Sequence, residues 1–221
     1  MKKNDDMNKK AAVLEKLAAM HPGAGTELKY GSAFQLLVAV MLSAQCTDRQ
    51  VNKITSGLFQ KFREPEDFAV LSWEDLAEKI KGCGLYRNKS RNIVSTSRIL
   101  VEKYGSQVPR QREALEALPG VGRKTANVMM NIAFGIPVMP VDTHVFRVSR
   151  RLGLSAGKTP AAVECDLEII VPPELMGTIH HCLIKHGREI CRARNPLCRE
   201  CGLSGICPES KENDDNGQEH S

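Results

Sequence analysis

The sequence predicts an all-α protein, and three observations support this fold class. Segments with apolar residues at helical spacing follow one another along the chain. Capping residues and glycine or proline breakers separate these segments. The sequence lacks the alternation of apolar and polar residues that a half-buried strand requires, and the stretch 137–142 is too short and too proline-rich for a central strand.

Five helices are predicted in the first half of the chain. The segment 32–43 is apolar on nearly all sides, so we expect a central, buried helix there. Thr47 is suited to cap the next helix, and Ser72 followed by Asp75 resembles a capping box. Gly105 follows the last helix of this half, in the position of a C-terminal cap. The predicted spans are 5–20, 32–43, 47–61, 72–82 and 88–104.

Five more helices are predicted in the second half of the chain, and two of them flank a glycine-rich turn. Asp142 is placed to cap a helix whose apolar residues begin at Val145. Thr159 caps the next helix, with Pro160 at its first position, and a proline pair ends it. The spans that the pattern fixes in this half are 112–118, 124–134 and 174–187.

Length and charge limit the classes of function. At 221 residues the chain is long enough for one large domain or two small ones. It has no apolar run of about 18 residues and no signal-type N-terminal stretch, which predicts a cytoplasmic protein without a membrane partner. The net charge is +5 although the segment 209–219 is acidic, so a polyanionic partner fits the composition. Solvated lysines explain such mild basicity equally well.

The segment Leu118-Pro-Gly-Val-Gly-Arg-Lys-Thr-Ala126 joins a tight glycine turn to the start of a helix. We expect Gly120 and Gly122 to allow positive φ angles and a close approach of phosphates, because glycine has no Cβ atom. The N-terminus of the following helix adds partial positive charge, so the turn suits an anion. An ordinary glycine turn between two helices is the alternative.

Four of the eight cysteines are gathered in one C-terminal segment, with six, two and five residues between them. In a reducing compartment such a group indicates a metal site rather than disulfides. Four thiolates suit either a [4Fe-4S] cluster or a tetrahedral zinc ion. The four are Cys191, Cys198, Cys201 and Cys207.

The remaining charged and thiol residues near this pattern have less specific roles. The arginines between the four cysteines can oppose the charge of a cluster or contact a DNA backbone. The other cysteines are expected to be small core residues. The arginines are Arg192, Arg194 and Arg199, and the cysteines are Cys46, Cys83, Cys165 and Cys182.

The glycine-turn segment, followed by Val141-Asp142-Thr-His144, resembles the endonuclease III family of helix-hairpin-helix DNA glycosylases. The resemblance covers nearly the whole chain and implies two lobes. One is a six-helix barrel over about 26–136, with the helix-hairpin-helix at about 112–134. The other is an iron–sulfur cluster domain formed by 1–25 together with 137–208. Residues 209–221 have the composition of a disordered acidic tail.

The resemblance also implies an activity. We expect a bifunctional DNA glycosylase and abasic-site lyase of base-excision repair. Such an enzyme removes oxidised pyrimidines from duplex DNA and cleaves the 3′ side of the abasic site by β-elimination. The expected partner is double-stranded DNA that contains these lesions, bound by a monomer in the cytoplasm at the nucleoid. The family's cluster loop has the same cysteine spacing, which favours a [4Fe-4S] cluster over zinc.

Lys124 stands in the first turn of the helix after the glycine turn, where the helix dipole disfavours a cation. We expect that field, together with partial burial near Arg123, to favour the neutral, nucleophilic amine. From the residue alone, a phosphate-binding lysine is an equal alternative. The resemblance implies the nucleophile, because Lys124 falls on the lysine that attacks C1′ of the sugar in the bifunctional members.

Asp142, read alone, is a helix cap. The resemblance adds a second role that the same carboxylate can fill. In the family, this aspartate stabilises the positive charge that develops on the sugar as the base leaves. His144 either contacts the substrate or packs locally.

A glycosylase that acts on duplex DNA must flip its target nucleotide and fill the gap. The resemblance assigns the filling to Gln45 and Leu85, which from the residues alone are a polar helix end and a core leucine. It also implies DNA binding through the hairpin, by Gly120, Val121, Gly122 and Arg123. Three further cations are general phosphate candidates or merely solvated, namely Lys89, Arg91 and Lys185.

Two rival functions fit parts of the pattern. A monofunctional adenine glycosylase of the same superfamily acts opposite oxidised guanine, but that branch usually lacks the lysine and carries an extra C-terminal domain. A non-catalytic DNA-binding module with a structural metal would bind abasic-site DNA without cleaving it.

Overall fold

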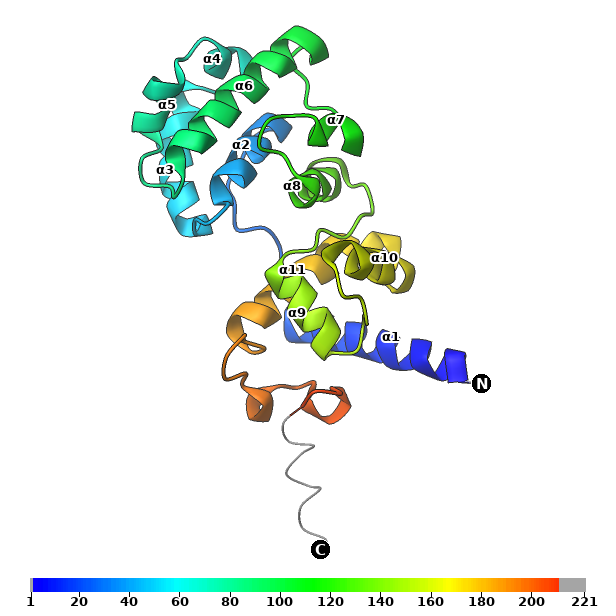
Figure 1. Cartoon of the computed structure of the whole chain (residues 1–221). Coiled ribbons are helices and arrows are strands. Elements are labelled where there is room, and N and C mark those ends of the chain that lie inside the picture. Colours follow the sequence, from blue (N-terminus) through cyan, green and yellow to red (C-terminus); the bar gives the residue numbers. More distant parts are fainter. Residues whose placement is uncertain (1, 211–221) are drawn as a thin grey trace, which may run out of the picture. The chain divides into compact units, whose positions relative to one another are not determined.

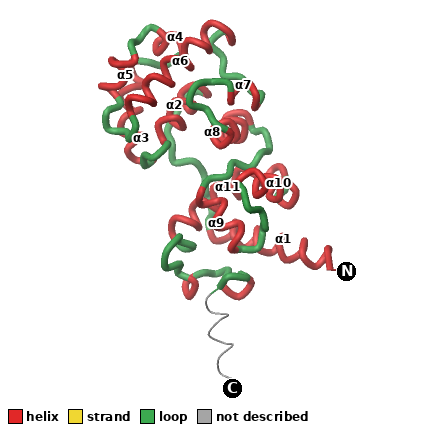
Figure 2. The backbone as a smooth tube through the Cα atoms, viewed as in Figure 1, coloured by secondary structure: helices red, strands yellow, loops and turns green. Residues whose placement is uncertain are grey.

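The structure, a computed structural model, describes residues 2–210 of the chain. This range contains helices and loops but no β-strand, as the tube in Figure 2 shows, so the predicted all-α fold class is confirmed. No helix in the same range is both long enough and apolar enough to cross a membrane. The tail predicted for 209–221 lies outside the described residues from position 211 onward.

The chain divides into two compact units. One is the continuous segment Glu27–Ile136, and the other combines Met1–Thr26 with Pro137–Ser221. Our expectation assigns residue 26 to the barrel lobe, whereas the structure places Thr26 with the second unit.

The unit Glu27–Ile136 is built around α2 (Ala33–Ser43), whose side chains are buried from Phe34 and Leu36 through Leu42. In Figure 1 α2 lies among α3, α6 and α8, which pack against it. A helix that is apolar on all sides needs such cover, so its predicted central position is confirmed. The other elements of this unit are α3 (Asp48–Lys61), α4 (Pro65–Ala69), α5 (Trp73–Lys79), α6 (Tyr86–Tyr104), α7 (Arg112–Glu116), α8 (Arg123–Val128) and the π-helical turn η1 (Met129–Ala133).

Side-chain caps begin the helices where the sequence predicts them. Ser32, Thr47 and Ser72 each accept a hydrogen bond from the backbone N–H three residues later, at the starts of α2, α3 and α5. Thr159 does the same at the start of α10 (Pro160–Ile170). Each such cap stabilises a helix by about 1 kcal/mol. Gly105 ends α6 with a φ of +53°, the left-handed conformation expected of a C-terminal glycine.

The short helix α4 is absent from the sequence-based prediction. Pro65 stands at its first position, and the carboxylate of Asp67 accepts hydrogen bonds from the backbone N–H groups of Arg63 and Glu64. Phe68 is fully buried and packs edge-to-face on its aromatic neighbours. A helix of five residues is too short to show an apolar period, so only its proline and capping residues mark it.

The regular helix predicted over 124–134 is wrong in its second half. The α-helical part, α8, ends at Val128, and the π-helical turn η1 continues to Ala133. The sequence pattern holds no sign of the wider turn, because Ile132 and Ala133 fit either geometry. Such π-turns are rare and are often found at functional sites.

The second unit is closed by its N-terminal helix. Val13, Leu14 and Leu17 of α1 (Lys2–Met20) are buried in the core of this unit, where α1 packs against α10 and α11. The stretch 137–142 forms no strand, as expected, and helices follow at the predicted places. The remaining elements are α9 (Thr143–Arg151), α10 (Pro160–Ile170), α11 (Met176–Glu189) and the 3-10 turns η2 (Pro173–Leu175), η3 (Cys198–Glu200) and η4 (Ser204–Ile206).

Candidate functional site

The two glycines of the hairpin have different reasons to be glycine. Gly120 has a φ of +79°, and a Cβ atom there would lie 2.6 Å from Nδ2 of Asn92 on α6. Gly122 has an ordinary extended conformation, with φ −96° and ψ 178°, and a Cβ atom there would meet no atom of the chain within 4 Å. The expected positive φ is therefore right for Gly120 and wrong for Gly122. The open space at Gly122 leaves room for a molecule outside the chain.

The hairpin is anchored to the unit Glu27–Ile136 by its other residues. The side chain of Val121 is buried in the core, and its backbone N–H donates to the carbonyl oxygen of Leu118 at 3.1 Å. Oγ1 of Thr96, on α6, donates to the carbonyl oxygen of Pro119 at 3.0 Å. The side chain of Val121 thus packs inward, although the resemblance implies that Val121 is among the DNA-binding residues.

Lys124 is the second residue of α8 and is exposed, as Arg123 is. The expectation that its amine is partly buried is therefore wrong. The buried residues of α8 are Ala126, Asn127 and Val128, so the first turn faces away from the core. Gly122 is the N-cap of α8, and no side chain caps this helix.

Gln45 and Leu85 lie on neighbouring loops of the same unit, and both are exposed, Leu85 by 57%. Their φ angles are +53° and +56°, in the left-handed region that residues with a Cβ atom rarely adopt. The loops touch, because a Cβ atom on Gly84 would lie 3.1 Å from the carbonyl oxygen of Gln45. The reading of Leu85 as a core residue is wrong, since its side chain is among the exposed apolar groups.

Asp142 lies in the second unit and caps α9. Its Oδ1 atom accepts hydrogen bonds from the backbone N–H groups of His144 and Val145, each at 2.8 Å. The predicted cap is confirmed. The carboxylate is only half-buried, so its fixed orientation coexists with access to solvent.

His144 packs locally, which the sequence left as one of two possibilities. Its Nδ1 lies 3.3 Å from a guanidinium nitrogen of Arg147. That guanidinium also donates to the carbonyl oxygens of Gly187 and Cys191, at 2.8 Å and 3.1 Å. His144 is therefore connected to the segment that carries the first of the four cysteines.

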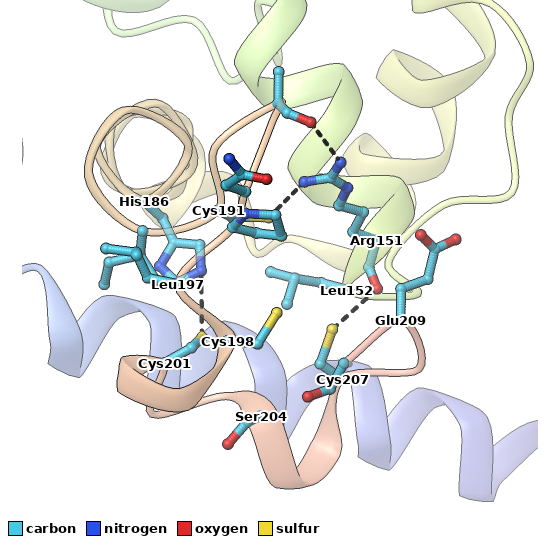
Figure 3. Close-up of a pocket in the computed structure, with 15 residues that line it drawn as sticks. Arg151, Leu152, His186, Cys191, Leu197, Cys198, Cys201, Ser204, Cys207 and Glu209 are labelled. Carbon is cyan, nitrogen blue, oxygen red and sulfur yellow. Dashed lines mark hydrogen bonds between the residues drawn. The ribbon is translucent and has the colours of Figure 1, made fainter. Parts of the chain in front are cut away.

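The four C-terminal cysteines line one cavity of about 180 Å³ (Figure 3). Sγ of Cys201 lies 3.7 Å from Nε2 of His186, and Sγ of Cys207 donates to the carbonyl oxygen of Arg151 at 3.3 Å. Burial raises the pKa of the Cys207 thiol. Within the part of the chain that the structure describes, no three His, Cys, Asp or Glu side chains are grouped closely enough to hold a single metal ion.

The other four cysteines divide between core and surface. Cys83 and Cys182 are buried, as expected, whereas Cys46 is half-buried and Cys165 is exposed. Cys165 lies two residues after Val163, on the side of α10 opposite its buried face.

Comparison with known proteins assigns the chain to a family. Residues 38–173 match the family described as "HhH-GPD superfamily base excision DNA repair protein". The chain is 49% identical to endonuclease III of Bacillus subtilis (strain 168) over 205 residues, which cover 92% of this chain and 94% of the relative. It is 47% identical to endonuclease III of Escherichia coli (strain K12) over 199 residues, covering 90% of this chain and 94% of that protein.

This chain belongs to the endonuclease III family. Two solved structures agree with that assignment. One is a trapped covalent intermediate of endonuclease III with DNA, the estranged-adenine complex, with 46% identity, a TM-score of 0.87 and coverage of 93% of this chain and 98% of that one. The other is a non-covalent endonuclease III–DNA complex, with 45% identity, a TM-score of 0.89 and coverage of 95% and 98%.

The predicted residues of this endonuclease III homologue fall into two groups. The hairpin, Lys124 and the loops of Gln45 and Leu85 all belong to the unit Glu27–Ile136, whereas Asp142, His144 and the four C-terminal cysteines belong to the other unit. The superfamily match spans the first group and Asp142, and it ends before the cysteine segment.

Sequence reasoning missed two arginines of this homologue that support the cysteine segment. Nε of Arg147 donates to the carbonyl oxygen of Cys191 at 3.2 Å, and Arg151 donates to the carbonyl oxygens of Arg192 and Ala193 at 2.7 Å and 3.3 Å. A guanidinium nitrogen of Arg151 also lies 3.6 Å from Sγ of Cys191. The available signal was their spacing of four residues on one helix, which places both side chains on one face of α9.

His186 is a third residue that the pattern did not single out. It is buried against His21, with 3.1 Å between Nδ1 of His186 and Nε2 of His21. Burial, and next the neighbouring His21, lowers the pKa of His186 to about 4. At neutral pH the ring is therefore uncharged.

Proposed function

We propose that this protein is a bifunctional DNA glycosylase and abasic-site lyase of base-excision repair. It removes oxidised pyrimidines from duplex DNA and cleaves the 3′ side of the resulting abasic site by β-elimination. The observation that carries this proposal is the match to a trapped covalent endonuclease III–DNA intermediate, together with an exposed lysine that begins the helix after the hairpin.

Lys124 is the proposed nucleophile. Its neutral amine attacks C1′ of the flipped nucleotide, the bond from C1′ to the base breaks, and the base leaves with the bonding electrons and takes up a proton. Opening of the sugar ring then gives an imine between Lys124 and C1′. Loss of a proton from C2′ allows the bond between C3′ and its phosphate oxygen to break, and water finally releases the lysine.

Asp142 is the proposed electrostatic partner of this reaction. Its carboxylate would stabilise the positive charge that builds up on the sugar while the base departs. The hydrogen bonds from His144 and Val145 hold one of its oxygens in place, so the charge needs little reorganisation during the reaction. The same carboxylate would also accept the proton that the lysine amine releases.

The hairpin and two loops are the proposed DNA-binding elements. The open backbone at Gly122 would admit a phosphate, while Arg123 supplies charge and Gly120 and Val121 hold the turn in shape. Gln45 and Leu85 would fill the space that the flipped nucleotide leaves. His144 would act through its contact with Arg147. We propose that the protein binds its DNA as a monomer, at the nucleoid.

The cysteine segment is the proposed site of a [4Fe-4S] cluster. Four thiols around one cavity form the donor set that such a cluster uses, and Arg151 and His186 supply hydrogen-bonding groups beside the sulfur atoms. The residues therefore fit the cluster. When bound to Cys191, Cys198, Cys201 and Cys207, it would cross-link the segment through its iron–sulfur bonds and stabilise the fold around it.

The test is incubation with a duplex that contains thymine glycol and with a matched abasic duplex, following base release and strand cleavage separately. The proposed enzyme performs both reactions. Base release without strand cleavage would indicate the monofunctional alternative, and binding without either reaction would indicate a non-catalytic module.

A further inference from the structure

Lys89 is a buried lysine in the first turn of α6. Only 6% of its surface is exposed, contrary to the solvated or phosphate-binding residue that the sequence indicates. Its ammonium donates hydrogen bonds to the carbonyl oxygens of Leu42 and Ala44, at 2.7 Å and 2.5 Å. A cation is costly to bury unless hydrogen bonds replace its hydration, so these two contacts explain how Lys89 is accommodated.

The two carbonyl groups lie at the C-terminal end of α2. The last carbonyls of a helix have no partner within the helix and carry partial negative charge, which suits an ammonium group. The carbonyl of Ala44 belongs to the peptide bond that joins Ala44 to Gln45. Lys89 therefore fixes the plane of the peptide from which Gln45 extends.

Gln45 needs such a hold, because its φ of +53° is unfavourable for a residue with a Cβ atom. The left-handed conformation costs roughly 1–2 kcal/mol. A strained backbone conformation of this kind persists only where surrounding contacts hold it, and it is often found at functional sites. The hydrogen bond from Lys89 to the carbonyl oxygen of Ala44 is such a contact for Gln45.

Lys89 is bonded to the second loop as well. Its backbone N–H donates to the carbonyl oxygen of Leu85 at 3.1 Å, in the first turn of the helix that Leu85 begins. Leu85 also has a positive φ, of +56°. One residue thus holds the loop of Gln45 through its side chain and the loop of Leu85 through its backbone.

Other contacts between these loops are weaker. Sγ of Cys46 lies 3.6 Å from Sγ of Cys83, and Nε2 of Gln50 donates to the carbonyl oxygen of Gly82 at 3.4 Å. Neither contact carries a charge as that of Lys89 does, and hydrogen bonds with a charged partner are roughly twice as strong as neutral ones.

We propose that Lys89 is a positioning residue that holds Gln45 and Leu85 together as one preformed wedge for the opened duplex. The inference rests on the proposed function, since it assumes that these two side chains replace the flipped nucleotide. Lys89 is buried and its ammonium is bound to backbone carbonyl groups, so its proposed action is through the conformation of the two loops.

The test compares Lys89→Met with a matched control, Lys103→Met. Methionine keeps the apolar stem of Lys89 and removes its ammonium, whereas Lys103 is an exposed residue in the last turn of the same helix. Each variant is assayed for base release from a thymine glycol duplex and for borohydride trapping on a single-stranded abasic oligonucleotide. The single strand has no base pair to open, so it reports Lys124 chemistry without the wedge.

We expect Lys89→Met to release thymine glycol from the duplex roughly 10- to 100-fold more slowly, the range that loss of a hydrogen bond to a charged group gives. Borohydride trapping on the single-stranded abasic site should stay within about threefold of wild type. A 2-aminopurine base beside the lesion, which brightens when it unstacks, should show less opening. Lys89→Arg, which keeps a donor cation, should recover part of the activity.

Equal loss on the duplex and the single strand would overturn the proposal, because it would indicate a general structural role. Duplex activity equal to that of Lys103→Met would overturn it as well. If wild type itself neither releases the base nor is trapped, the proposed function fails instead, so the two failures are distinguishable.

A double-mutant cycle covers the case in which Lys89→Met does not fold. Lys89→Arg and Gln45→Ala are combined, and circular dichroism verifies the fold of each protein. If Lys89 acts through Gln45, the two effects on duplex base release should be markedly less than additive. Strict additivity would contradict the proposal.

Discussion

The backbone N–H of Val145 donates a 2.8 Å hydrogen bond to Oδ1 of Asp142, and this bond gives the carboxylate a structural role beside its proposed chemical one. The two roles can be separated by substitution. Asparagine and serine cap helices about as well as aspartate, but neither carries its charge.

We therefore predict that Asp142→Asn folds normally and releases thymine glycol roughly 10²-fold more slowly, on the scale of removing one electrostatic partner of the transition state. Borohydride trapping on a preformed abasic site should be less impaired, because the base has already left. The measurements are the melting temperature, the rate of thymine glycol release and the rate of borohydride trapping on the abasic site. A large fall in melting temperature would assign the defect to the cap instead.

Lys124→Gln should abolish borohydride trapping and strand cleavage while leaving the melting temperature unchanged. The side chain is exposed, so its loss removes no packing, and glutamine keeps length and polarity. Arg123→Gln is the matched control, since it removes a neighbouring exposed cation and should weaken DNA binding without preventing the adduct. An adduct with Lys124→Gln would show that another amine is the nucleophile.

Substitution by alanine should have different effects at the two hairpin glycines: mainly on DNA affinity at Gly122 and mainly on stability at Gly120. Gly122→Ala meets no atom of the chain, so we expect a stability change below about 1 kcal/mol. Its affinity for damaged and undamaged duplexes should fall alike, because the proposed role of the backbone there is to bind phosphate rather than to read a base. Fluorescence anisotropy with both duplexes measures this, and a loss confined to damaged DNA would contradict it.

Gly120→Ala should unfold at clearly lower temperature. It combines a positive φ with a close contact to Asn92, and the φ alone costs roughly 1–2 kcal/mol. The pair of variants thus separates the folding role of the turn from its DNA-binding role.

The purified protein should be yellow-brown and contain about four irons per chain, because the four C-terminal thiolates are the proposed ligands of a [4Fe-4S] cluster. Cys198→Ser should lose iron and destabilise the C-terminal segment and DNA binding more than the chemical step, since Lys124 lies in the other unit. Metal analysis and single-turnover cleavage at saturating enzyme measure these effects. Stoichiometric zinc without iron would be the opposite result.

Cys83 should resist alkylation at neutral pH. Burial, and next its contact with Cys46, raises the pKa of the Cys83 thiol to about 11. Iodoacetamide reacts with thiolates, so labelling of Cys83 in the folded protein should be slow at pH 8 and rise about tenfold per pH unit below the pKa. Peptide mass spectrometry measures it, with urea-unfolded protein as the control that labels rapidly at pH 8.

The sequence was most informative where a short stretch determines its own structure. The caps at Ser32, Thr47, Ser72 and Thr159 each involve neighbours three residues away, so pattern and geometry coincide. The spacing of the cysteines likewise placed all four around one cavity.

Sequence reasoning was least informative where distant segments meet. Lys89 looks like a surface cation until α2 supplies carbonyl groups from more than forty positions away. Arg147 and Arg151 gain their roles only when α9 lies beside the cysteine segment. A Cβ atom would clash at Gly120 but not at Gly122, and the clash is with Asn92, which belongs to another helix.

The position of α1 has a consequence for synthesis on the ribosome. The segment Glu27–Ile136 is continuous and can fold as soon as it emerges, but the apolar face of α1 packs against α11, which is made much later. At about 5–20 residues per second, Val13, Leu14 and Leu17 wait roughly 8–30 s for that partner. During this interval the nascent chain presents an uncovered apolar helix, to which a chaperone has access.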